Sequence, residues 1–100
     1  MREQKQLPLL HIFVCANRRD ASSPLGPGCG DHGEEAYAAL KDEVARRGAF
    51  ASAWITKTHC LGVCPKSGCT IAMYDRARSL YSEVTPKDAL ALLSERMKPC

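Results

Sequence analysis

Hydrophobic residues along this chain fall into short runs that polar or glycine-rich segments separate. The first run, Leu9 to Cys15, is almost continuously apolar and predicts a strand that is buried on both faces. Residues 16–30 are rich in proline and glycine and should form a loop. A helix is expected from about His32 to Arg47, with Asp31 as its N-cap and Glu34 completing a capping box.

The second half of the chain predicts three strands and one more helix. Phe50 to Lys57 contains a tryptophan, an isoleucine and a threonine and should be the second strand. Thr70 to Tyr74 and Ser79 to Val84 are short runs joined by a polar turn, which predicts a hairpin. Thr85 can cap a second helix, because Pro86 suits the first helical turn.

The order strand, helix, strand, strand, strand, helix predicts an α/β fold of the β-α-β-β-β-α type. The first two strands should be parallel neighbours joined by a right-handed crossover, and the hairpin should extend the same four-stranded mixed sheet. Each helix has one apolar stripe, so both should pack on the sheet. This is the plan of a reduced thioredoxin-like domain, expected over residues 9–98 after a polar N-terminal segment, residues 1–8.

Composition narrows the range of functions. One hundred residues with a net charge of +3 make one small domain. Its basic residues are scattered among acidic ones, whereas nucleic-acid binding would need a basic stripe with interleaved aromatics. No apolar run is long enough to span a membrane, and the N-terminal stretch lacks the features of a signal peptide. We therefore expect a cytoplasmic protein whose thiols stay reduced.

Four of the six cysteines should meet at one edge of the sheet. Cys15 ends the first strand and Cys29 precedes the first helix, while Cys60 and Cys64 follow the second strand. Parallel strands end at the same edge, so these thiols should converge on a metal centre. Zinc ligands usually come in close pairs, and the long Cys15 to Cys29 loop favours a larger iron-sulfur cluster. Zinc remains the open alternative.

These cysteine motifs resemble the thioredoxin-like 2Fe-2S ferredoxins of bacteria, the Shethna-type ferredoxins, whose fold also occurs in a peripheral subunit of respiratory NADH dehydrogenase. The resemblance covers roughly residues 9–97. The motifs that carry it are Phe13-Val-Cys15, Gly28-Cys29-Gly, Cys60-Leu-Gly-Val-Cys64-Pro and Tyr81-x-x-Val84-Thr-Pro86-x-Asp88-Ala. It implies that Cys15, Cys29, Cys60 and Cys64 bind a 2Fe-2S cluster, which makes the protein a one-electron carrier and not an enzyme.

The two remaining cysteines are not expected to be ligands, and two other functions compete with the electron carrier. Cys69 should be a small buried hydrophobic residue, and Cys100 a frayed terminal thiol. A structural or sensory zinc domain would use the same four cysteines. A thiol-disulfide oxidoreductase is a weaker alternative, because the chain has no Cys-x-x-Cys at a helix N-terminus.

The expected partners are redox proteins that the sequence does not identify, and the sequence leaves homodimer formation open. Lys57, Lys66 and Arg18 or Arg19 could ring the cluster and steer an acidic partner, or they could be ordinary solvated residues.

Overall fold

The computed structural model describes residues 1–18, 28–59, 61–62 and 68–97. These residues form four strands and two helices in the predicted order. The elements are β1 (Leu10–Cys15), α1 (Gly30–Arg47), β2 (Ala53–Thr58), β3 (Cys69–Tyr74), β4 (Arg78–Val84) and α2 (Pro86–Arg96). The predicted α/β fold class is confirmed.

The strands form one mixed sheet in the order β2-β1-β3-β4. β1 and β2 are parallel, as the strand-helix-strand unit predicted, and their register pairs Cys15 with Thr58. β3 runs antiparallel to β1 and forms the predicted hairpin with β4. Cys15 and Thr58 therefore end their strands side by side, at the edge of the sheet where the cysteines were expected to meet.

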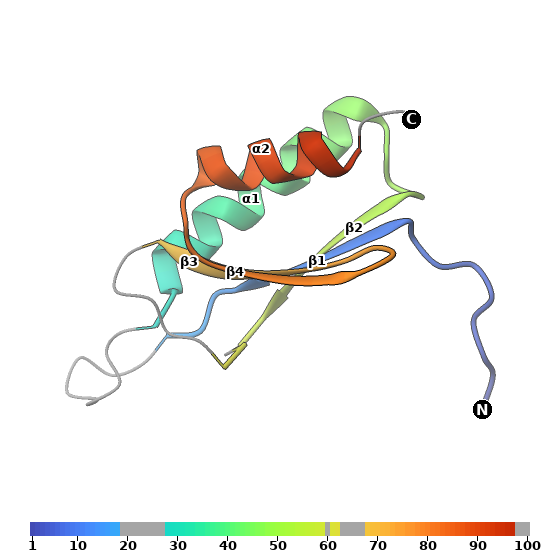
Figure 1. The fold of residues 1–100 in the computed structure, drawn as a ribbon, viewed down its shortest axis with the longest axis horizontal. Coiled ribbons are helices and arrows are strands. Elements are labelled where there is room, and N and C mark those ends of the chain that lie inside the picture. The colour runs from blue at the N-terminus through green and yellow to red at the C-terminus, as the bar shows by residue number, and fades with distance from the viewer. Residues whose placement is uncertain (19–27, 60, 63–67, 98–100) are drawn as a thin grey trace.

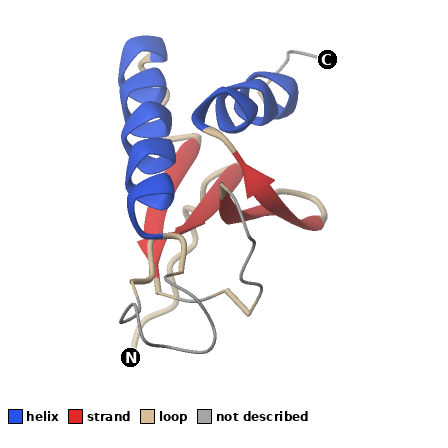
Figure 2. Ribbon diagram, turned by 90° about the vertical axis from the view of Figure 1, so that its left-hand side faces the viewer, coloured by secondary structure: helices blue, strands red, loops and turns tan. Residues whose placement is uncertain are grey.

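Both helices lie on the same face of the sheet, and the opposite face has no helix over it (Figures 1 and 2). α1 crosses over β1 and β2, and its buried side chains follow the predicted apolar stripe. The fully buried aliphatic side chains of the core come from both layers: Ile12, Val14, Ile71 and Met73 from the strands, Leu40 from α1 and Leu93 from α2. Packing of these core side chains fixes both helices on the sheet, and with them the start of α1.

The uncovered face of the sheet is largely aromatic. His11 and Phe13 of β1 stack on one another with their ring centroids 4.1 Å apart, and both are only half-buried. Trp54 packs edge-on against His11, and Tyr74 lies beside Phe13. The prediction that β1 is buried on both faces is therefore wrong. Apolar rings on this open face make the sequence of the strand look like that of a fully buried one.

The start of α1 differs from the prediction. Cys29 is the N-cap, the helix begins at Gly30, and no side chain caps the first turn. Asp31 lies inside that turn and accepts a hydrogen bond from Arg18 at 2.6 Å. Glu34 pairs with Lys57 of β2 at 3.2 Å, so it does not complete a capping box. Each carboxylate has a basic partner outside the helix, and these ion pairs replace the predicted cap.

The start of α2 agrees with the prediction. The Thr85 hydroxyl accepts a hydrogen bond from the Asp88 amide at 3.1 Å, and the Thr85 amide donates one to the Asp88 carboxylate at 3.2 Å. This reciprocal capping box fixes the chain as it leaves β4. Among the described residues, neither helix is both long enough and apolar enough to cross a membrane.

Candidate metal centre

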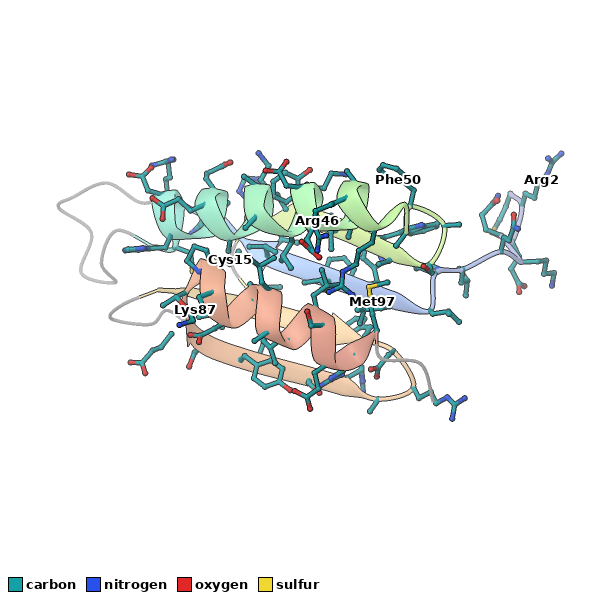
Figure 3. All side chains as sticks on the ribbon, turned by 90° about the horizontal axis from the view of Figure 1, so that it is seen from above. Arg2, Cys15, Arg46, Phe50, Lys87 and Met97 are labelled. Carbon is teal, nitrogen blue, oxygen red and sulfur yellow. The ribbon has the colours of Figure 1, made fainter. Side chains whose placement is uncertain are left out.

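Two of the predicted ligands meet between β1 and α1. Cys15 is the last residue of β1, and Cys29 is the N-cap of α1. Their side chains share a hydrogen bond, and the two residues are only 2% and 1% exposed. Figure 3 shows Cys15 toward the end of the molecule where α2 begins, with Met97 toward the other end. The structure thus brings together two thiols that are separated by a long loop in the sequence.

Glycines allow this close approach of the helix to the strand. A Cβ atom on Gly28 would lie 2.2 Å from the carbonyl oxygen of Asn17, and Gly28 has a positive φ of 82°. On the other side of Cys29, the Gly30 amide donates a hydrogen bond to the same carbonyl at 3.0 Å. The backbone on both sides of Cys29 is therefore fixed against the segment that follows Cys15.

Cys69, the first residue of β3, is a third buried thiol in the same region. It is 0% exposed, as the sequence predicted for a small buried residue. Burial raises the pKa of the Cys69 thiol to about 12, and the neighbouring Cys29 and Cys15 contribute to the rise. Cys69 belongs to the same cluster of buried side chains as the two predicted ligands, although it is on the third strand.

Thr70, which follows Cys69, contacts Cys29 directly. Its backbone amide and its hydroxyl both donate hydrogen bonds to the Cys29 sulfur. Burial raises the pKa of the Cys29 thiol to about 11, and the hydrogen bond with Cys15 adds to this rise. The two hydrogen bonds from Thr70 act in the opposite direction because they stabilise a negatively charged sulfur. No motif in the sequence marks Thr70 as part of the site.

A bulge fixes the start of β3. The pairing of β3 with β4 shifts register between Cys69 and Ile71, and Glu83 on the opposite strand has a positive φ of 57°. A Cβ atom on Gly68 would lie 2.6 Å from the Val84 carbonyl oxygen, so only glycine fits there. This contact anchors the backbone directly before Cys69 and Thr70.

The other two predicted ligands, Cys60 and Cys64, lie outside the described residues, as do Cys100, Lys66 and Arg19. Within the described ranges, no group of three or more His, Cys, Asp or Glu side chains could hold a metal ion. Cys60 follows Thr58 by two residues, and Thr58 is the register partner of Cys15. The complete ligand set therefore stays a prediction.

Two basic residues that were considered as steering groups have acidic partners. Arg18 binds Asp31, and Lys57 binds Glu34. All four side chains are substantially exposed, so these are surface ion pairs. The pairing favours the alternative that Arg18 and Lys57 are ordinary surface residues.

Comparison with solved structures identifies the fold. A crystal structure of the wild-type thioredoxin-like [2Fe-2S] ferredoxin from Aquifex aeolicus matches with a TM-score of 0.73 and 25% sequence identity, over 91% of this chain and 86% of that one. The chain has the fold of a thioredoxin-like [2Fe-2S] ferredoxin. Another structure of this ferredoxin matches with a TM-score of 0.77 and 24% identity, covering 92% of this chain and 83% of that one.

The ferredoxin fold confirms the resemblance that the sequence motifs indicated. Two further matching structures, each with a TM-score of 0.76 and 24% identity over 89% of this chain and 87% of the other, are cysteine-to-serine variants of the same ferredoxin. Their substituted positions are four residues apart, as are Cys60 and Cys64 here. No family model matches the chain, and no curated protein matches it.

Proposed function

We propose that this protein is a ferredoxin, a one-electron carrier that binds a 2Fe-2S cluster through Cys15, Cys29, Cys60 and Cys64. The observation that carries the proposal is the meeting of two buried thiols, Cys15 and Cys29, within a ferredoxin fold. They come from the end of β1 and the start of α1, the two places where the sequence motifs predicted ligands.

The described side chains fit an iron-sulfur cluster. Thiolates are the ligands of such clusters, and Cys15 and Cys29 already have their sulfurs within hydrogen-bonding distance of one another. Cys29 is at the N-terminus of α1, where the helix dipole favours a negatively charged sulfur. The amide and hydroxyl of Thr70 would continue to stabilise that charge once the thiol had lost its proton to become a ligand.

Chain connectivity supports the inclusion of Cys60 and Cys64. Cys60 follows Thr58 by only two residues in the sequence, and Thr58 is the register partner of Cys15. The spacing of Cys60 and Cys64 equals that of the two cysteines replaced in the ferredoxin variants. This equality supports the same pair of positions as ligands.

When bound, the cluster would supply one-electron redox chemistry. Cys15 and Cys29 would hold it at the end of the sheet, and their burial would exclude water from that side. The Thr70 donors and the N-terminus of α1 oppose the negative charge of the sulfur ligands.

The thiols disfavour an oxidoreductase that works through a reactive cysteine. Such an enzyme needs a thiolate at neutral pH, whereas burial raises the pKa values of both Cys29 and Cys69. Cys15, Cys29 and Cys69 are free cysteines, which also suits ligands in a reducing compartment. We accordingly propose a cytoplasmic electron-transfer protein that exchanges electrons with other redox proteins.

The deciding experiment is the visible spectrum of protein purified without oxygen, recorded before and after dithionite, with iron, sulfide and zinc analysis of the same sample. A brown protein that bleaches on reduction, with about two irons and two sulfides per chain, supports the ferredoxin. A colourless protein with one zinc per chain would replace the ferredoxin with a zinc domain.

Single cysteine-to-serine variants test the ligand set. Changes at Cys15, Cys29, Cys60 and Cys64 should each abolish the cluster spectrum or reshape it. Cys100→Ser is the matched control and should keep the parental spectrum. An unchanged spectrum in Cys64→Ser would remove Cys64 from the ligand set.

A further inference from the structure

Thr70 is unusual in its burial. It is 0% exposed, and among the described residues it is the only polar or charged one that is buried. A hydroxyl loses its hydrogen bonds to water when it is buried, so it must have a partner inside the protein. The Thr70 hydroxyl therefore needs a hydrogen-bond partner among the buried groups around it.

The strand register directs Thr70 toward the predicted ligands. Val14 of β1 pairs with Ile71 of β3, and both are core residues on the helix-covered face. Cys15 comes directly after Val14 and Thr70 directly before Ile71, so the antiparallel register continues toward Cys15 and Thr70 at the same end of the sheet. Thr70 is thus next to one predicted ligand across the ladder.

Thr70 binds the other predicted ligand through two donors. The backbone amide and the hydroxyl both reach the Cys29 sulfur. The register shift between Cys69 and Ile71 spans Thr70, and Gly68 packs against the Val84 carbonyl just before it, which fixes the backbone that carries these donors. Cys29 is fixed on its own side by the backbone contacts of Gly28 and Gly30 with Asn17. The backbone is thus fixed on both sides of the contact, at Thr70 and at Cys29.

We propose that Thr70 is a positioning residue that orients the Cys29 ligand and raises the reduction potential of the cluster. This inference rests on the proposed ferredoxin function. Reduction adds one negative charge to the cluster and its sulfur ligands, so a hydrogen bond to a ligand sulfur stabilises the reduced state more than the oxidised one. Removing the Thr70 hydroxyl removes one donor and should lower the potential.

The test compares three substitutions at this position in the cluster-loaded protein. Thr70→Val has the shape of threonine without its hydroxyl, Thr70→Ala is smaller and cannot overfill the site, and Thr70→Ser keeps the hydroxyl. Thr56→Val is the matched control, because Thr56 is also in the sheet but its hydroxyl lies 2.8 Å from His11 Nε2. The readouts are the reduction potential from a redox titration and the iron-sulfur stretching bands in resonance Raman spectra.

The expected result is a lower potential and shifted iron-cysteine bands in Thr70→Val and Thr70→Ala, with values near the parent in Thr70→Ser and Thr56→Val. Loss of the cluster from both hydroxyl-free variants, with retention in Thr70→Ser, would also support the role of the hydroxyl. Parental potentials in all variants would overturn the inference, as would loss of the cluster from all three Thr70 variants. A parent protein with no iron would instead refute the proposed function.

Discussion

A Cβ atom on Gly33 would lie 1.9 Å from the carbonyl oxygen of Cys15. Gly33 is in the first turns of α1, so the helix backbone touches the end of β1 at the residue that carries a predicted ligand. This contact sets the distance between Cys15 and the N-terminus of the helix. It leads to the first prediction.

Gly33→Ala should force α1 away from β1 and destabilise the protein. Overpacking of a rigid contact typically costs about 1–3 kcal/mol of unfolding free energy, and this contact is with backbone that cannot rotate away. The same displacement should lower the iron content. Urea unfolding and iron analysis measure the two effects. Glu35→Ala is the control, because Glu35 is exposed on the same helix. Parental stability and iron content would show that the helix can move without loss.

Cys69→Ala should keep the cluster while lowering stability. Cys69 is completely buried and starts β3, so removing its sulfur leaves a small cavity that costs about 1–2 kcal/mol. The visible spectrum should remain that of the parent, and the midpoint of chemical unfolding should fall. A protein that loses its cluster but keeps its unfolding midpoint would make Cys69 a ligand.

Glu43→Gln should weaken the protein at neutral pH but not at pH 2. Hydrogen bonds from Arg46 and Arg47 hold the pKa of the Glu43 carboxyl at about 2, below its ordinary value. A lowered folded-state pKa means that the charged form stabilises the fold above about pH 4.5, and this contribution disappears as the pH falls toward 2. Thermal melts of parent and variant between pH 7 and pH 2 should therefore converge at the acid end.

The control for Glu43 is Glu35→Gln, which should melt like the parent at every pH. Because any acid-induced loss of the cluster affects all three proteins, the difference between parent and variant isolates the carboxyl. A difference in melting temperature between parent and Glu43→Gln that stays constant down to pH 2 would contradict this prediction.

Arg96→Ala should loosen α2 from the hairpin. The Arg96 guanidinium donates hydrogen bonds to Asp75 at 2.7 Å, to Ser79 at 3.1 Å and to the Tyr81 hydroxyl at 2.8 Å. The Arg96 side chain is only 19% exposed, and losing this group of bonds should cost about 2 kcal/mol of unfolding free energy. Chemical unfolding measures the loss, with Arg76→Ala in the exposed hairpin turn as control. Equal midpoints for the two variants would contradict the role of Arg96.

The sequence predicted the elements well where a pattern depends on neighbouring residues. The N-cap at Thr85 is local and was predicted at the correct residue, since the bonding groups lie within one helical turn. Asp31 has a similar local pattern, yet it failed as a cap. Arg18, 13 positions away, pairs with its carboxylate, and only the folded chain brings the two together.

The part of the candidate site that lies at the ends of the parallel strands could be predicted from the sequence. Cys15 and Cys29 could be brought together on paper, because a parallel β1-β2 pair and its crossover helix determine the edge at which they meet. Thr70 could not be found in the same way. Its role depends on β3 lying against β1 and on the register shift between β3 and β4 at Cys69 to Ile71, and neither has a clear signal in the sequence.

The ends of the sheet also determine where a linker or fusion partner could be attached without approaching the cysteines. Leu10 begins β1 at the opposite end of the strand from Cys15, and Met97 lies toward the end of the molecule away from Cys15 (Figure 3). A fusion partner or a surface linker attached before Leu10 or after Met97 would therefore be remote from the cysteine edge. Immobilised on an electrode by either attachment, the domain would turn the end of the sheet that carries Cys15 away from the electrode and toward a soluble partner.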